Sequence, residues 1–217
     1  MLTEIPQSPS AAPKLLQGPH GAIEVAWSLP KQALRGWMLV GHPHPLFGGA
    51  MSNKVTYALA AAAAEAGWLA LRFNFRGVGA SQGAHDGGRA ETDDYLSLAA
   101  ALRQHLPDHP AVYAGFSFGG FVALRAAERK TPSGVLTVAP PLTKYVDLPT
   151  PPVPTVPWTL IHGTADDVVL ISDNEAALVG APRAPHWVRV DGAGHFFHGQ
   201  LDVIKSATQE LLSGLTI

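Results

Sequence analysis

Short apolar runs alternate with helical stretches along most of the chain, and this alternation limits the fold more than any other feature. Each apolar run is four to eight residues long, which is the usual length of a buried strand. Strands that alternate with helices form a mostly parallel sheet, and the helices cover both of its faces. The sequence therefore predicts an α/β fold in which the carboxyl ends of the strands share one edge of the sheet.

The boundaries of these segments follow from apolar runs, glycines and prolines. Ser52 is a plausible cap for the first helix, and Gly67 a plausible stop. The expected strands lie at 22–29, 36–41, 68–75, 111–116, 134–139, 158–163 and 186–192, and the expected helices at 53–66, 91–106, 118–130, 171–180 and 199–215. Six or so prolines between 140 and 157 predict an irregular connection there.

Composition narrows the range of functions. Apolar residues make up 47% of the chain and charged residues 15%, which is typical of a compact globular protein. A net charge of −2 gives no electrostatic reason to expect nucleic acid or an anionic membrane as a partner. The absence of cysteine excludes disulfides and a cysteine nucleophile.

The chain is long enough for one domain. We expect a loose, Pro- and Ser-rich arm at 1–13 and a single domain at 14–217. The first residues lack the basic segment and apolar stretch of a secretory signal, so the sequence favours a cytoplasmic protein. It indicates no oligomeric state.

The pattern G-x-S-x-G occurs twice, as GASQG at 79–83 and as GFSFG at 115–119. A serine nucleophile of this type needs a strand that enters the turn directly and a helix that leaves it directly. Ser117 has both, because the run AVYAGF precedes it and FGGFVALRAAERK follows it. Ser81 has neither, because loop residues separate it from the preceding strand and AHDGG follows it. We therefore expect Ser117 to be the nucleophile and Ser81 to belong to a glycine-rich turn.

A serine hydroxyl needs a base and an acid that orients the base. Asp166 and Asp167 follow the strand WTLIHG, and His195 follows the strand HWVRVDG in the loop DGAGHFFHG. The order serine, acid, histidine is that of α/β-hydrolases. We favour Asp166 over Asp167, which could cap the next helix, and His195 over His198, which lies at the start of the last helix.

Two backbone amides must stabilise the oxyanion. The amide of Phe118, directly after the nucleophile, is the first. The second should come from HPHPLFGG after the strand at 36–41, where the two prolines have no N–H. His44, Leu46 and Phe47 remain as donors, with Leu46 the first choice and His44 the second.

Other polar residues in these loops have structural interpretations. The pairs His42 with His44 and His195 with His198 lack the spacing of a zinc site, and His162 is expected to be structural. Arg72, Asn74 and Arg76 alternate along one strand. We expect them to fix the following loop, for example by pairing with Glu91 or Asp94, rather than to bind substrate.

Five motifs together resemble the α/β-hydrolase superfamily, in particular its compact bacterial branch related to dienelactone hydrolases and small carboxylesterases. They span residues 36–200 and are HPHPLFGG followed by SNK, RFNFRGVGASQG, GFSFGG, HGTADDVV and GAGHFFHG. The resemblance implies an α/β-hydrolase fold and a carboxylesterase-type hydrolase whose triad is Ser117, Asp166 and His195. It departs from dienelactone hydrolases themselves, whose nucleophile is cysteine.

Many relatives that bind long apolar chains carry a helical cap after the sixth strand. At that place this chain has only PPLTKYVDLPTPPVPTVP, which is short and rich in proline. We therefore expect no substantial cap and an open cleft lined by the phenylalanines 47, 116, 118, 196 and 197. Such a cleft suits small esters.

The expected reaction needs only a small-molecule ester and water, with no metal and no organic cofactor. A small peptidase or a thioesterase would use the same triad. A non-catalytic protein that binds small molecules on this fold is the alternative outside enzymes.

Overall fold

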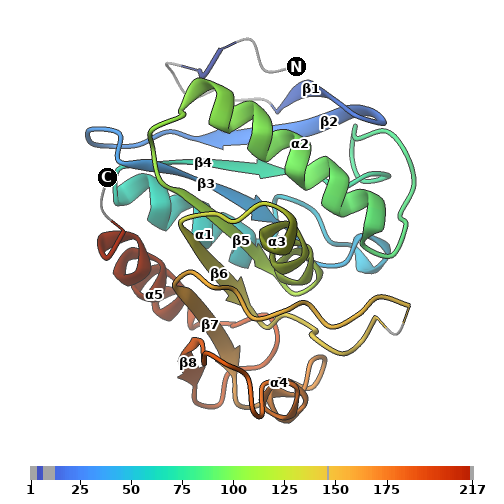
Figure 1. Cartoon of the computed structure of the whole chain (residues 1–217), viewed down its shortest axis with the longest axis vertical. Helices are drawn as coiled ribbons and strands as arrows, with labels where there is room; N and C mark the ends of the chain where they lie inside the picture. Colours follow the sequence, from blue (N-terminus) through green and yellow to red (C-terminus); the bar gives the residue numbers. More distant parts are fainter. Residues whose placement is uncertain (1–3, 7–12, 146, 216–217) are drawn as a thin grey trace.

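The computed structural model describes residues 4–6, 13–145 and 147–215. Within these residues eight strands form one sheet, in the order β1-β2-β4-β3-β5-β6-β7-β8 (Figure 1). The strands are β1 (Lys14–Gly18), β2 (Gly21–Ser28), β3 (Gly36–Gly41), β4 (Trp68–Phe73), β5 (Ala111–Phe116), β6 (Gly134–Val138), β7 (Trp158–Gly163) and β8 (His186–Val190). β2 pairs antiparallel with both β1 and β4, and every later neighbour is parallel.

Helices cover both faces of this sheet, as the alternation in the sequence predicts (Figure 1). α1 (Lys54–Glu65) and α5 (Leu201–Ser213) pack together on one face. α2 (Arg89–His105) and α3 (Phe118–Arg129) pack together on the other. The short α4 (Ile171–Ala177) lies between β7 and β8 in the chain.

β3 shows why the central strands are apolar throughout. Side chains alternate across a strand, so a strand with helices on both faces must be apolar at every position. Trp37 and Leu39 belong to the core on the α2 and α3 side, whereas Met38 and Val40 belong to the core on the α1 and α5 side. All four are at most 1% exposed, which leaves the loops at the carboxyl ends as the place for polar chemistry.

The predicted fold class is confirmed, and the predicted strands and helices begin and end within three residues of the observed ones. Strand β1 was not predicted, because its sequence KLLQG is short and largely exposed at the sheet edge. The predicted cap Ser52 is wrong: α1 begins one residue later, so Asn53 is the cap and its Oδ1 accepts bonds from two backbone amides, 2.9 and 3.4 Å away. Most of the arm predicted at 1–13 lies outside the described residues.

The connection between β6 and β7 leaves the edge of the sheet uncapped. Its described residues, 140–145 and 147–157, contain no helix and no strand. Among the described helices, none has both the length and the apolar character needed to cross a bilayer.

Candidate active site

Ser117 occupies a single residue between the end of β5 and the start of α3. Its backbone has φ 53° and ψ −120°, a combination that a residue with a side chain rarely adopts. The turn is held by backbone bonds: the Ser117 N–H donates to the Val138 carbonyl at 2.8 Å, and its carbonyl accepts from Gly120 and Phe121 at 2.9 and 3.1 Å. The strand therefore enters the serine directly and the helix leaves it directly.

Glycines flank Ser117 because backbone segments touch there. A Cβ on Gly115 would lie 2.2 Å from the carbonyl carbon and oxygen of Gly119. A Cβ on Gly119 would lie 2.3 Å from the carbonyl carbon and oxygen of Gly41, in β3. No L side chain fits at these distances, so the pattern G-x-S-x-G reflects close packing of the turn against the neighbouring strand.

The Ser117 hydroxyl is free for chemistry. Although Ser117 occupies the N-cap position of α3, its side chain makes no capping bond. The Ser117 hydroxyl has no hydrogen bond to any described residue, His195 included, and both side chains line one pocket. Catalytic hydrogen bonds are often long before substrate binds, so the missing bond does not argue against a catalytic serine at this pocket.

Asp166 and His195 meet although 29 positions separate them in the chain. Each follows a parallel strand, β7 or β8, and the His195 Nδ1 lies 2.8 Å from Asp166 Oδ2. A carboxylate accepts a bond, so Nδ1 carries the proton and Nε2 keeps its lone pair. The other carboxylate oxygen, Oδ1, accepts from the amides of Val168 and Val169 at 2.9 and 2.8 Å.

This environment keeps Asp166 ionised. Burial opposes the charge and raises the pKa of Asp166, but hydrogen bonds from His162, His195 and Val169 outweigh it and hold the pKa below its ordinary value. Its neighbour Asp167 is exposed, and the cap position of α4 is held by Leu170 rather than by Asp167. Of the two aspartates, Asp166 is therefore the one placed against the imidazole.

Two buried side chains lie next to Asp166: His162 approaches its carboxylate, and Asn174 lies on the other side of the His162 ring. The His162 Nε2 lies 2.9 Å from the Val169 carbonyl and 3.5 Å from Asp166 Oδ2, so this nitrogen carries the proton. Asn174, in α4, donates to Pro140 O at 2.7 Å and lies 3.3 Å from the His162 Nδ1. The pair ties the acid loop to the connection after β6. Sequence reasoning missed Asn174, since a single polar residue in a short helix carries no signal of burial.

Ser117 and His195 share a pocket of about 460 Å³ at the carboxyl edge of the sheet. Its lining is largely apolar and comprises Pro43, His44, Phe47, Gly48, Gly49, Asn53, Ser117, Lys144, Val168, His195 and Phe196. A larger pocket, of about 700 Å³, lies elsewhere and is lined by none of the three candidate triad residues. We place the candidate site by the chemistry of its side chains rather than by volume.

The predicted aromatic lining is partly wrong. Phe47 and Phe196 line the pocket, but Phe116, Phe118 and Phe197 are fully buried in the core. Phe116 is buried because it ends β5, which is covered on both faces of the sheet. Phe118 is buried because it is the first residue of α3. Phe116 still contributes, since the centre of its ring lies 4.9 Å from the centre of the His195 ring and the ring packs against the imidazole.

The loop after β3 offers three amides, and two of them are engaged. The Leu46 N–H donates to the His44 Nδ1 at 3.2 Å, and the Phe47 N–H donates to the His44 carbonyl at 3.1 Å. The His44 N–H has no acceptor among the described residues, and neither has the N–H of Phe118 at the start of α3. Burial, with a further contribution from the neighbouring His85, lowers the pKa of His44, so that its Nδ1 remains an acceptor.

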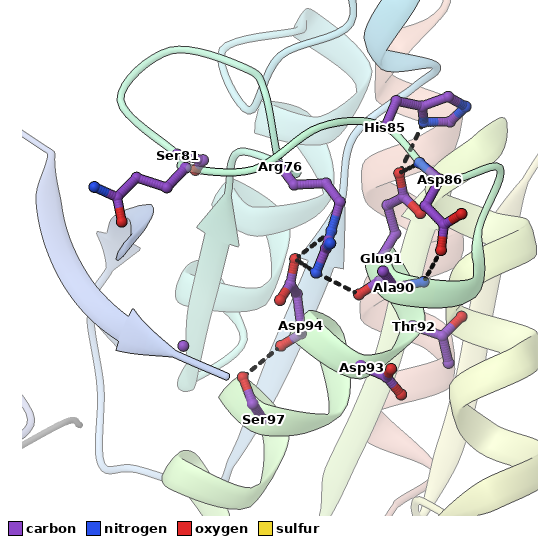
Figure 2. Close-up of polar contacts among 12 residues, drawn as sticks. Arg76, Ser81, His85, Asp86, Ala90, Glu91, Thr92, Asp93, Asp94 and Ser97 are labelled. Carbon is purple, nitrogen blue, oxygen red and sulfur yellow. Dashed lines mark hydrogen bonds and ion pairs between the residues drawn. The ribbon is translucent and has the colours of Figure 1, made fainter. Parts of the chain in front are cut away.

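The second serine of the pattern is part of the framework. The Ser81 hydroxyl donates to the Asn74 carbonyl at 2.7 Å and accepts from the Glu24 N–H at 2.9 Å, so it joins the loop after β4 to β2. Figure 2 shows Ser81 in this loop, apart from the ion pair between Arg76 and Asp94. The Arg76–Asp94 distance is 2.9 Å, and the prediction that the arginine fixes the loop is confirmed.

The same loop carries His85, which pairs with the carboxylate of Glu91 in the first turn of α2 (Figure 2). The His85 Nδ1 lies 2.8 Å from Glu91 Oε1, and the buried Glu91 also accepts from the amides of Asp86 and Gly88. The His85 ring lies 4.7 Å from the ring of His44 and 5.3 Å from that of Phe118. The loop therefore packs against both residues whose amides are free.

Comparison with known proteins agrees with this geometry. The family described as alpha/beta hydrolase fold matches residues 46–141. A solved α/β serine hydrolase homologue from Coxiella burnetii is 33% identical, with a TM-score of 0.87 over 94% of this chain and 98% of that one. A Xanthomonas campestris protein, described as an α/β serine hydrolase without lid, is 34% identical, with a TM-score of 0.88 over 98% and 97%. An uncharacterized protein of Rickettsia prowazekii is 31% identical over 90% of this chain and 86% of its own length.

Proposed function

We propose that this chain, which belongs to the α/β-hydrolase family, cleaves small carboxylic esters through an acyl-enzyme on Ser117. The observation that carries the proposal is the shared pocket, in which the unbonded hydroxyl of Ser117 and the imidazole of His195 face the same space. The bond of 2.8 Å between His195 and Asp166 supports a base of the correct tautomer beside that hydroxyl.

In the first step His195 Nε2 removes the hydroxyl proton, and Oγ of Ser117 attacks the ester carbonyl carbon. Negative charge then develops on the carbonyl oxygen, and Asp166 stabilises the imidazolium. We assign the two stabilising amides to Phe118 and His44, because neither N–H has an acceptor among the described residues. Leu46, the first choice from sequence, is the weaker candidate because its N–H already donates to the His44 ring.

In the second step the imidazolium gives its proton to the leaving oxygen, and the alcohol departs. Water then attacks the acyl-enzyme, with His195 again as the base, and the carboxylic acid is released. Apart from the ester and water, every group in these steps is a side chain or a backbone amide of this chain.

The uncapped pocket supports a preference for short acyl chains. The pocket holds about 460 Å³, and the described part of the connection between β6 and β7 supplies no helix above it. A cleft of this size encloses a small ligand but leaves a long acyl chain in water. We therefore expect kcat/KM for p-nitrophenyl esters to fall as the acyl chain lengthens beyond the pocket.

Substitution of the two adjacent aspartates tests the mechanism. Asp166→Asn should lower kcat for p-nitrophenyl acetate about 10³-fold or more, because the amide no longer holds the imidazole in the productive tautomer. Asp167→Asn, the matched control, changes an exposed side chain and should leave kcat within about threefold. Equal losses in the two variants, or full activity in Asp166→Asn, would contradict the triad.

A further inference from the structure

Two further pockets adjoin the pocket that contains Ser117 and His195. The catalytic pocket shares Gly48, Asn53 and Phe196 with a neighbouring pocket of about 290 Å³. The neighbouring pocket in turn shares Ser52 and Lys54 with the larger one, of about 700 Å³. The three pockets therefore adjoin one another along a path from Ser117 past the first turn of α1 to the surface formed by α1, α5 and the end of β2. We call the two outer pockets together the basic groove.

Most of the charged side chains that line this path are positive. One cation lines the catalytic pocket and four line the basic groove, against a single acid, Glu65. The cations are Lys144 in the pocket and Lys31, Lys54, Arg72 and Lys205 in the groove. Five of the 15 lysines and arginines thus lie along the path, but only one of the 17 acids, in a chain of net charge −2. A concave surface with one sign of charge attracts ligands of the other sign.

Several of these cations have no carboxylate to neutralise them. Neither Lys54 nor Arg72 nor Lys144 forms an ion pair with a described residue. Lys31 pairs with Glu65, and Lys205 pairs with Asp202, each at 3.3 Å between the lysine Nζ and a carboxylate oxygen. The side chains of both pairs are exposed, so the pairs are weak and an anion can compete for either lysine.

Arg72 is held in a fixed position at this surface. Its guanidinium donates to the Met51 carbonyl at 2.8 Å and lies 4.9 Å from the centre of the Tyr57 ring. Both interactions leave its positive charge uncompensated, since a carbonyl and an aromatic face carry no net charge. An arginine fixed in this way is preorganised for an anion rather than for a neutral group.

The groove leaves the active site on the side where the leaving group is expected. It begins at Phe196, the residue after His195, and continues along His198. In the proposed reaction His195 gives its proton to the leaving oxygen or sulfur, so that atom and its substituent lie next to this segment. The acyl portion has the rest of the pocket, near Pro43 and Val168.

We propose that the preferred substrate is an ester or thioester whose leaving alcohol or thiol carries an anionic group, a phosphate or a carboxylate, that binds in the basic groove. This inference rests on the proposed function, because it assumes hydrolysis at Ser117. The reaction balances as before: the acyl C–O or C–S bond breaks, water supplies OH to the acyl group, and the proton goes to the leaving group.

A set of matched thioacetates tests the proposal. Each is S-acetylated on an ω-mercaptoalkyl chain that ends in a phosphonate, a carboxylate or a neutral hydroxyl, with the chain lengthened stepwise. Thiol release measures kcat/KM. We expect the anionic substrates to exceed the neutral one of equal length by about tenfold at low salt, once the chain reaches Lys54, and the advantage to shrink with added salt. The phosphonate and carboxylate arms distinguish the two kinds of anion.

Variants of the groove locate the effect. Lys54→Gln and Lys205→Gln should each lower the ratio of anionic to neutral kcat/KM about threefold, and the double variant more. Lys130→Gln, which removes a lysine at the end of α3, on the opposite face of the sheet, is the matched control and should leave the ratio unchanged. An anionic-to-neutral ratio near one at every chain length, or a ratio that Lys54→Gln and Lys205→Gln do not change, would overturn the proposal.

The same assay separates this proposal from the proposed function. Hydrolysis of the neutral thioacetate that is lost in Ser117→Ala supports the catalytic assignment whatever the anion preference is. If the wild type hydrolyses none of these substrates, inhibition of Ser117 labelling by the free anionic thiols still measures the groove. Protection by the phosphonate or carboxylate thiol but not by the neutral one supports the groove, and equal protection by all three overturns it.

Discussion

The turn after β5 and the loop after β4 carry the same pattern around a serine, but different forces hold them. Around Ser117 the backbone is packed so closely, within the turn at Gly115 and against β3 at Gly119, that no side chain fits at either position. Around Ser81 the close contacts are with side chains: a Cβ on Gly79 would lie 2.2 Å from Glu24 Oε2, and hydrogen bonds and the Arg76–Asp94 ion pair fix the loop. The first arrangement leaves its hydroxyl without a partner, whereas the second uses both bonding capacities of its hydroxyl. A sequence pattern therefore identifies a reactive serine only together with the contacts that hold its turn.

The largest difference between the two serines should appear in catalysis. Ser117→Ala should lower kcat for p-nitrophenyl acetate by about 10⁴-fold or more, because the acyl-enzyme cannot form. Ser81→Ala should change kcat less than about threefold, since the Ser81 hydroxyl bonds only to the backbone of Glu24 in β2 and of Asn74 just after β4. Steady-state kinetics of the two purified variants measures the contrast. Comparable losses in both variants would remove the distinction between the two turns.

Alanine substitutions of glycines in the two regions should lower the free energy of unfolding by different amounts. Gly119→Ala places a Cβ 2.3 Å from the backbone of Gly41, so we expect a loss of about 4 kcal/mol in the free energy of unfolding, or no folded protein. Gly87→Ala, in the loop after β4, meets no atom within 4 Å and should cost about 1 kcal/mol for its positive φ of 65°. Urea unfolding gives both values. A Gly119→Ala variant as stable as Gly87→Ala would refute the close packing inferred here.

Low pH should destabilise the protein at the start of the loop after β4, because the side chain of His42 accepts a hydrogen bond there. The His42 Nε2 accepts from the Phe75 N–H at 2.9 Å, and burial lowers the pKa of His42 from 6.5 to about 4. Between these values the unfolded chain binds a proton that the native state does not. The free energy of unfolding should therefore fall by up to about 3 kcal/mol as the pH drops from 6.5 to 4.

The variant His42→Gln isolates this contribution. Glutamine does not titrate, so the slope of the free energy of unfolding between pH 6.5 and pH 4 should be shallower than in the wild type, even if the variant is less stable throughout. Urea unfolding at several pH values measures the slope. An identical slope in both proteins would show that His42 is not the group responsible.

The smallest expected effect is on the free energy of unfolding of the two alanine variants. Here Ser81→Ala should lose more than Ser117→Ala, the reverse of their order in catalysis. Ser81→Ala leaves the buried Glu24 N–H and Asn74 carbonyl without their partner, which should cost about 1–2 kcal/mol. Ser117→Ala removes no hydrogen bond to a described residue and should leave the free energy of unfolding within about 0.5 kcal/mol. Thermal unfolding of the two alanine variants gives the comparison. A larger loss in Ser117→Ala would mean that its hydroxyl has a structural partner.

The sequence predicted what depends on neighbours along the chain. The apolar runs that enter and leave Ser117 gave the strand and the helix correctly, and the order of Ser117, Asp166 and His195 placed three side chains after three parallel strands. These features survive because the alternation of strand and helix dictates which loops share an edge.

The features that sequence reasoning missed depend on contacts between distant segments. The engagement of the Leu46 amide by the His44 ring is a matter of one side-chain rotamer. The burial of Asn174 requires α4 to meet Pro140, and the basic groove requires α1, α5 and β2 to lie together. Lysine and asparagine usually lie exposed on protein surfaces. Their presence in a sequence therefore does not indicate a buried contact or a groove.

Mass spectrometry of the protein after reaction with a fluorophosphonate probe tests the central claim most directly. A single adduct on the peptide that contains Ser117, lost in Ser117→Ala and kept in Ser81→Ala, is the expected result. An adduct on Ser81, or an intact and folded protein that the probe does not modify, would contradict the assignment of Ser117 as the nucleophile.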